Sequence, residues 1–108
     1  MKEFVPVVIL ITASTDEEAQ KIADRLLTER KAACVNIISK VRSLFWWKGE
    51  LDSADEALLI VKTKASLIDE IVSLVKEVHS YQVPEVIALP LIGGNQDYLN
   101  WMGDELGD

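Results

Sequence analysis

The sequence is short of cysteine and of basic residues, and each shortage excludes a class of protein. Cys34 is the single cysteine, so no disulfide can form within the chain and a disulfide-stapled secreted domain is excluded. Eleven Lys and Arg residues against eighteen Asp and Glu residues give a formal net charge of -7, which leaves no basic patch for a nucleic-acid backbone. We therefore expect a reducing, cytoplasmic location and no nucleic-acid partner.

Long apolar runs are lacking as well. The first one, residues 4–13, is interrupted by Pro6 and is shorter than the roughly 15 to 30 residues of a secretion signal or the roughly 20 of a membrane span. Hydrophobic residues still make up 49% of the chain and charged residues 27%, which suits one hydrophobic core and excludes a disordered tail. We expect a single domain over residues 1–108 and no membrane association.

Four apolar segments are typical of β-strands. Residues 7–12 and 86–89 are continuous apolar runs of the kind that is buried on both faces of a sheet. Residues 33–47 and 57–63 flank the turn signal at residues 48–50, which predicts a hairpin. At about 3.3 Å per residue the outgoing strand would reach roughly 45 Å, so the tip of this hairpin should protrude from the domain.

Three segments carry helix signals. Thr15 with Glu18 forms a capping box, and Ser66 and Asp97 are expected to cap two further helices. The resulting order, β-α-β-β-α-β-α, predicts an α+β fold of the ferredoxin-like, split β-α-β type. The apolar stripes expected along the three helices comprise Ala19, Ile22, Ala23, Leu26 and Leu27, then Ile68, Ile71, Val72, Val75 and Val78, then Tyr98, Trp101 and Met102.

Strands that are apolar at successive positions imply that both faces of the sheet need cover, whereas the two main helices can cover only one face. Full burial of a large aliphatic side chain contributes about 1.5 to 3 kcal/mol, so half a dozen exposed ones would cancel most of the stability of a small domain. We expect a second copy of the chain to provide the cover.

Five short blocks, spread over nearly the whole chain, form a specific combination. They are Ala32–Ile37, Ser43 with Phe45–Gly49, Glu56 with Lys62 and Thr63, His79 with Tyr81, Pro84 and Glu85, and Tyr98 and Leu99 with Trp101. Together these blocks resemble the CutA family of divalent-cation tolerance proteins. The resemblance implies a homotrimer similar in architecture to PII-type signalling proteins, with hairpins that wrap neighbouring subunits, no enzymatic reaction, and a role in tolerance of divalent cations such as copper.

The chain departs from the family pattern at several positions. Ser80 stands where the family usually has proline, and Phe45 where it usually has tyrosine. Some members also carry a cysteine in the first strand and paired histidines at the end of the second helix, which together suit a soft metal ion. Ile11 and Val78 occupy those positions here, so we expect no required cofactor and at most weak binding of Cu²⁺.

The candidate metal ligands are His79, Glu85 and Cys34. His79 is the only histidine of the chain, and three symmetry copies of it can converge in a trimer. A second interpretation makes His79 a hydrogen-bonded residue at a helix end. Cys34, among apolar neighbours, is equally well explained as an inert small hydrophobe.

Two other functions can be drawn from the same residues. His79, Tyr81 and Glu85 can supply an acid, a hydroxyl and a base for catalysis, but no nucleophile or oxyanion loop accompanies them, so we expect no enzymatic activity. A PII-like sensor would bind a small anion between subunits, near Lys62 and Thr63 on one side and the Gly93–Gly94 pair on the other. Otherwise, these glycines provide the positive φ of a turn.

Aromatic residues mark the expected subunit interface. Neighbouring side chains along a strand point to opposite faces, so Trp46 and Trp47 cannot both pack on one monomer. Aromatic side chains are enriched at interface hot spots, whereas the acidic charge opposes stacking on nucleic acid. We expect an interface that includes Phe45, Trp46, Trp47, Tyr81 and Trp101.

Overall fold

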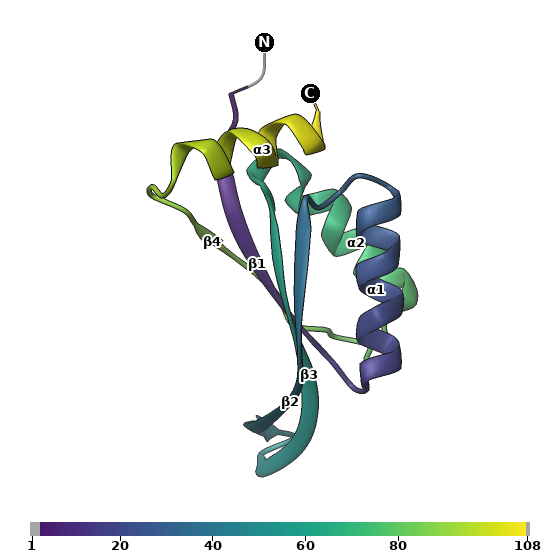
Figure 1. Cartoon of the computed structure of the whole chain (residues 1–108). Helices are drawn as coiled ribbons and strands as arrows, with labels where there is room; N and C mark the ends of the chain where they lie inside the picture. Colours follow the sequence, from purple (N-terminus) through teal and green to yellow (C-terminus); the bar gives the residue numbers. More distant parts are fainter. Residues whose placement is uncertain (1–2, 108) are drawn as a thin grey trace.

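The computed structural model describes residues 3–107 as a four-stranded antiparallel sheet with α1 and α2 packed on one side (Figure 1). The strand order β2-β3-β1-β4 is that of the split β-α-β arrangement, which confirms the predicted fold. The elements are β1 (Pro6–Ala13), α1 (Asp16–Thr28), β2 (Cys34–Trp47), β3 (Glu50–Lys64), a 3₁₀ turn (Ala65–Leu67), α2 (Ile68–Val78), β4 (Val86–Pro90) and α3 (Gln96–Leu106).

The hydrophobic core lies between the sheet and the two helices α1 and α2. Alternate residues of β1 and β3 point into it, because the side chains of a strand alternate between the two faces. Leu27, expected in the stripe of α1, is instead 41% exposed, and Leu74 of α2 is buried although it was not expected there. The core residues include Ile9, Ile11, Ile22, Leu26, Leu59, Val61, Ile71 and Val75.

The helix caps agree only partly with those predicted. The Thr15 side chain accepts a hydrogen bond from the Glu18 N–H (3.1 Å), which confirms the N-terminus of α1. The prediction for Ser66 is wrong, because this residue lies inside the 3₁₀ turn that precedes α2 and makes no cap. Asp97 does not cap α3 either: Asn95 accepts from the Asp97 N–H (2.9 Å), and Asp97 lies in the first turn.

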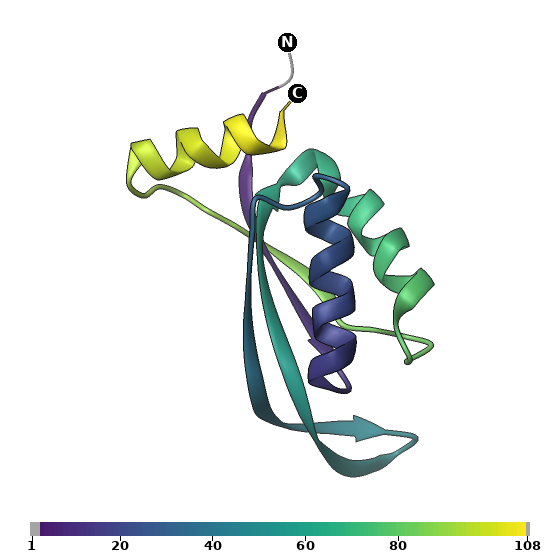
Figure 2. The same cartoon turned by 45° about the vertical axis from the view of Figure 1, so that its right-hand side comes forward.

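The hairpin of β2 and β3 is longer than predicted and bends near its middle. Lys48 and Gly49 form its two-residue turn with positive φ angles of 50° and 82°, as hairpin turns of the I′ type require. The pairing register shifts between Ile38 and Val41, and such a bulge bends a strand pair. Beyond this point the hairpin curves away from the body of the molecule (Figure 2), which accounts for the longest dimension of 47 Å.

Helix α3 lies across the end of the sheet where β1 begins and β3 ends, and on the opposite side from α1 and α2 (Figures 1 and 2). Its residues Met102 and Leu106 are buried. The ammonium group of Lys64, at the end of β3, donates a hydrogen bond to the Gly107 carbonyl (2.8 Å) and so holds the C-terminal end of the helix. No helix within residues 3–107 has the length and apolar character that crossing a membrane requires.

Candidate functional site

Helix α3 covers only one end of the sheet face that lies opposite α1 and α2 (Figure 2). Residues that pair directly in antiparallel strands point to the same face. Leu10 therefore lies beside Ile60 on one side and Ile87 on the other. We call this surface the open face; the side chains that form it belong to Val8, Leu10, Cys34, Asn36, Ile38, Leu58, Ile60, Lys62, Ile87 and Leu89.

Large apolar side chains of the open face are in contact with solvent. Ile38, Ile87 and Leu89 are 44%, 52% and 50% exposed, and the four apolar residues of the central strands are half-buried. The expectation that the sheet is apolar on both faces is thus confirmed. A continuous apolar surface of this kind marks a site of interaction in a soluble protein.

A second exposed apolar surface lies at the tip of the hairpin. Trp46 is 71% exposed, and Leu51, which pairs with it across the hairpin, is 70% exposed. Phe45 and Trp47 point to the other face and are 36% and 55% exposed, so both faces of the tip are apolar. The Lys48 ammonium group lies 5.8 Å from the centroid of the Trp47 ring.

His79, the residue that follows α2, has a fully buried side chain. Its Nε2 atom lies 2.7 Å from the carbonyl oxygen of Thr12, and its Nδ1 atom accepts a hydrogen bond from the Tyr81 N–H at 2.9 Å. A backbone N–H can only donate, so Nδ1 is the acceptor and Nε2 carries the proton that is donated to Thr12. Both ring nitrogens are therefore occupied by hydrogen bonds, as expected for a structural role.

Glu18 completes this polar cluster from the first turn of α1. Its carboxylate accepts hydrogen bonds from the N–H groups of Ser14 (3.1 Å) and Ser80 (2.9 Å), and one oxygen lies 3.5 Å from His79 Nε2. Burial raises the pKa of Glu18, but the hydrogen bonds from Ser14 and Ser80 outweigh burial, so the pKa lies below its ordinary value. The carboxylate thus ties the end of α2 to the start of α1.

Tyr81 reaches from the same loop to β3. Its hydroxyl donates a hydrogen bond to the carboxylate of Glu56 (3.0 Å), which is buried. Burial and the negative charge of Glu56 raise the pKa of the Tyr81 phenol. The ring of Tyr81 also lies against His79, with 4.9 Å between ring centroids. Together with Glu18, these contacts fix the loop that leads from α2 to β4.

The three candidate metal ligands do not meet in one chain. Cys34, the first residue of β2, pairs with Lys62 on β3. His79 instead contacts Thr12, which pairs with Leu58, four positions before Lys62 on β3. Glu85 is exposed just before β4. In the part of the chain that the structure describes, no three His, Cys, Asp or Glu side chains are close enough together to hold a metal ion.

The residues of the alternative anion site are also separated. The Thr63 hydroxyl points into the core, where it donates a hydrogen bond to the Lys31 carbonyl (2.6 Å), so it is unavailable to a ligand. Gly93 and Gly94 do not have positive φ angles, so the expectation that they provide them in a turn is wrong. Of the predicted set, Lys62 alone belongs to the open face.

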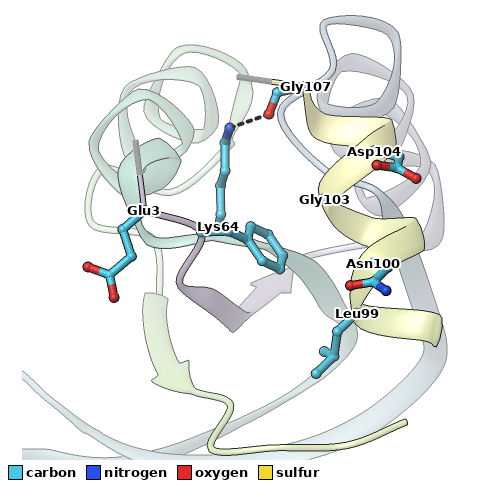
Figure 3. Close-up of a pocket in the computed structure, with 8 residues that line it drawn as sticks. Glu3, Lys64, Leu99, Asn100, Gly103, Asp104 and Gly107 are labelled. Carbon is cyan, nitrogen blue, oxygen red and sulfur yellow. Dashed lines mark hydrogen bonds between the residues drawn. The ribbon is translucent and has the colours of Figure 1, made fainter. Parts of the chain in front are cut away.

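A hollow of about 440 Å³ lies between the N-terminal segment, the end of β3 and α3 (Figure 3). The Lys64 side chain extends along the wall of this hollow toward Gly107, and the carboxylates of Glu3 and Asp104 point away from the Lys64 ammonium group (Figure 3). The buried cation is thus used to anchor α3. A further hollow, of about 370 Å³, lies between the start of α1 and the bulged part of the hairpin.

Sequence patterns did not identify the partners of His79 and Tyr81. Glu18 was expected only as a helix-capping residue, and Glu56 only as part of a family motif. Both carboxylates accept hydrogen bonds from residues far away in sequence. Glu18 and Ser80 are 62 positions apart, and Glu56 and Tyr81 are 25 positions apart. No local signal in the sequence indicates such pairs.

The fold and the two exposed apolar surfaces define a ferredoxin-like α+β subunit with an uncovered sheet face and a protruding hairpin. The family model described as CutA1 divalent ion tolerance protein matches residues 7–105, and the chain belongs to this family.

Relatives from bacteria and plants agree with this assignment. The chain is 43% identical to the divalent-cation tolerance protein CutA of Thermus thermophilus over 93% of this chain and 97% of that protein. It is 44% identical to Protein CutA 1, chloroplastic, of Oryza sativa over 89% of this chain and 54% of that protein, so it spans about half the length of this plant relative.

Solved structures agree with the sequence comparison. The divalent cation tolerance protein from Thermus thermophilus matches with a TM-score of 0.92 at 42% identity, over 94% of this chain and 99% of that chain. The periplasmic divalent cation tolerance protein CutA from Archaeoglobus fulgidus matches with a TM-score of 0.91 at 40% identity, over the same shares. The subunit fold is therefore that of the CutA1 structures.

Proposed function

We propose that the protein is a non-enzymatic homotrimer that contributes to tolerance of divalent cations, copper among them. The observation that carries the proposal is the open face. It holds seven large apolar side chains, each worth about 1.5 to 3 kcal/mol when fully buried. In an isolated subunit these side chains are only partly buried, so part of this free energy is not gained. A second copy of the chain, with the same apolar surface, can cover them. These side chains are Val8, Leu10, Ile38, Leu58, Ile60, Ile87 and Leu89.

The arrangement of the strands favours a ring of subunits. The two edges of the sheet are different strands, β2 on one side and β4 on the other. A contact that joins one kind of edge to the other is heterologous, and such contacts close into cyclic assemblies when the rotation permits. Pairing of the edges would also protect backbone groups that are otherwise open to non-specific association. The relation to the CutA family supports three subunits in this ring.

The hairpin tip is the second support for assembly. Its aromatic residues lie beyond the hydrophobic core and pack on nothing in the described chain that would remove them from water. Trp46 and Trp47 are more than half exposed, so contact with a neighbouring subunit would bury much of their surface. Tyr81 and Trp101, 38% and 41% exposed, are the remaining residues that we place in the interface.

For the metal itself we propose weak binding of Cu²⁺ centred on His79; because Glu85 and Cys34 do not meet His79 within one chain, they could serve as further ligands only from neighbouring subunits. The hydrogen bonds of the imidazole explain why binding would be weak, because a metal ion must displace one of them to reach a ring nitrogen. A role in tolerance then does not require a tightly held ion. We propose a cytoplasmic location on the ground of the single cysteine.

Light scattering after size exclusion tests the assembly. We expect about three times the chain mass of 12.1 kDa in dilute solution. A stable monomer would contradict the proposal, and a dimer would contradict the stoichiometry. The role in tolerance is tested by measuring how cells that lack the gene grow in medium with added copper. The cells receive a copy of the gene that encodes either the parent sequence or Ile60→Glu. This substitution would place a charge in the middle of the open face, so rescue by the parent alone would link tolerance to assembly.

A further inference from the structure

Lys62 brings a positive charge to the open face. Its partner on β1 is Val8 and its partner on β2 is Cys34, so the three side chains lie in one row. Leu89 on β4 continues the row beyond Val8. A lysine in such a row extends its stem over apolar neighbours while its ammonium group stays hydrated at the surface of the isolated subunit.

Four other basic residues have counter-charges, whereas Lys62, at the open face, has no ion pair among the described residues. Arg25, Arg30, Lys31 and Lys40 lie within 4.0 Å of carboxylates. For residues 3–107, no ion pair includes Lys62 at that distance, and its described partner is the ring of Tyr98, whose centroid is 5.7 Å from the ammonium nitrogen. An aromatic face attracts a cation but does not neutralise it.

Assembly changes the surroundings of this charge. When the open face is covered, water is removed from the row that contains Lys62, and a desolvated ammonium group without a paired anion is strongly disfavoured. The ten positions of the open face include no Asp or Glu, and Glu56, two positions before Leu58 on β3, already accepts a hydrogen bond from the Tyr81 hydroxyl. Because a second copy presents the same strand positions, its open face cannot supply the missing carboxylate. The counter-charge must then come from elsewhere.

The neighbours of Lys62 are suited to an oxyanion. Asn36, two positions beyond Cys34 along β2 on the same face, has an amide NH₂ donor, while its amide oxygen accepts a hydrogen bond from the Cys34 thiol (4.0 Å). Tyr98 adds an aromatic surface, with the Trp101 ring 5.3 Å from it. Val8 and Leu89 provide apolar walls. Hydrogen-bond donors around one fixed cation, with apolar walls, form the typical environment of a small anionic ligand.

We propose that Lys62 is the centre of a binding site for a small oxyanion of the carboxylate or phosphate class, completed when a second subunit covers the open face. This inference rests on the proposed assembly, because the isolated subunit presents only half of the site. The anion neutralises Lys62 and thereby favours the assembled state, so ligand and assembly stabilise each other.

Thermal unfolding of the assembled protein tests the site. The protein is first dialysed against chloride, and inorganic phosphate or citrate is then added at constant ionic strength, with chloride as the reference. We expect a saturable rise of the unfolding temperature in the parent. Lys62→Met should weaken the apparent affinity by about tenfold or more, and Lys62→Arg should retain it. Lys76→Met is the matched control, since Lys76 is exposed on α2, and it should respond like the parent.

Light scattering on the same samples separates the possible outcomes. A trimer that shows no saturable response to phosphate or citrate, or whose response is unchanged in Lys62→Met, overturns the anion site and leaves the proposed assembly intact. A Lys62→Met variant that dissociates more readily than the parent in chloride alone shows that a carboxylate of the neighbouring subunit pairs with Lys62, which also overturns the site. A monomeric parent instead overturns the proposed function.

Discussion

His79 and Thr12, 67 positions apart in sequence, are joined by a hydrogen bond of 2.7 Å between the imidazole Nε2 and the backbone carbonyl. The bond connects the end of α2 to the last part of β1. Because Nδ1 at the same time accepts from the Tyr81 N–H, the ring is held as a neutral, fully buried linker. The most obvious metal ligand of the chain thus has a structural role in the subunit.

The first prediction follows from this role. His79→Ala should lower the free energy of unfolding by about 2 to 4 kcal/mol, because it leaves the Thr12 carbonyl and the Tyr81 N–H without their partner in a buried region. Thermal unfolding followed by circular dichroism measures the change, with Lys21→Ala on the exposed side of α1 as the control. Equal unfolding temperatures for the two variants would show that the imidazole bonds contribute little.

The second prediction concerns Glu18 and acid. Its pKa in the folded chain is below the ordinary value, so its contribution to stability is present above the unfolded pKa of about 4.5 and is lost as the pH falls through the folded pKa. The parent should therefore lose stability more steeply than Glu18→Gln between about pH 5 and pH 3. Unfolding temperatures across this range measure the two slopes. Parallel curves would mean that Glu18 does not contribute to acid sensitivity.

The third prediction uses the Tyr81 phenol. Tyr81→Phe should cost about 1 to 3 kcal/mol, because it removes the hydroxyl donor of the buried Glu56 carboxylate and leaves the rest of the ring in place. Since burial and Glu56 raise the pKa of Tyr81, this contribution is complete below about pH 10 and is lost as the pH rises through the folded pKa. Alkaline unfolding of Tyr81→Phe should accordingly depend less on pH than that of the parent. Tyr98→Phe is the control for the loss of a phenol elsewhere.

Sequence reasoning succeeded for elements whose stability depends on local pattern. The positions of β1 and β4 and the Thr15 cap of α1 were predictable, because apolar runs and capping involve near neighbours. The predicted burial of β4 on both faces is wrong for the subunit, since this edge strand is exposed from Ile87 to Pro90. Strand β3 begins at Glu50 and not near residue 57, since its polar first part is held by pairing with β2. Tertiary pairing here outweighs the low strand preference of residues such as Asp52 and Asp55.

The candidate site was less predictable than the fold. His79, Tyr81 and Glu85 were grouped because they are close in sequence, yet the contacts that fix the first two come from β1, α1 and β3. The sequence pattern places Lys62 and Thr63 together in one anion site, but adjacent residues of a strand point to opposite faces, and only Lys62 is on the open face. The pleat separates neighbours that the motif groups together.

The fourth prediction addresses the hairpin tip. Trp47→Ala should weaken assembly by about 2 kcal/mol or more, because an aromatic anchor at an interface is lost, while the subunit core is unchanged. Sedimentation over a dilution series measures dissociation, and circular dichroism reports the subunit fold. Asp52→Ala, which lies opposite Phe45 on the same hairpin, is the control. Identical dissociation of Trp47→Ala and the parent would show that the tip is not an anchor.

The last prediction concerns copper. The His79 imidazole is the only borderline-soft nitrogen ligand of the chain, and Cu²⁺ has the highest affinity of the divalent first-row ions for such ligands. Because both ring nitrogens are engaged, calorimetry of the parent should show weak binding of Cu²⁺ and still weaker binding of zinc or nickel. Val78→His introduces the second histidine that some relatives carry at the end of this helix, and it should raise the affinity for Cu²⁺ by about tenfold or more. His79→Ala decides whether the ring takes part at all. Unchanged binding in that variant would remove His79 from the site, and no binding in either the parent or Val78→His would mean that tolerance does not depend on direct capture of the metal at this helix end.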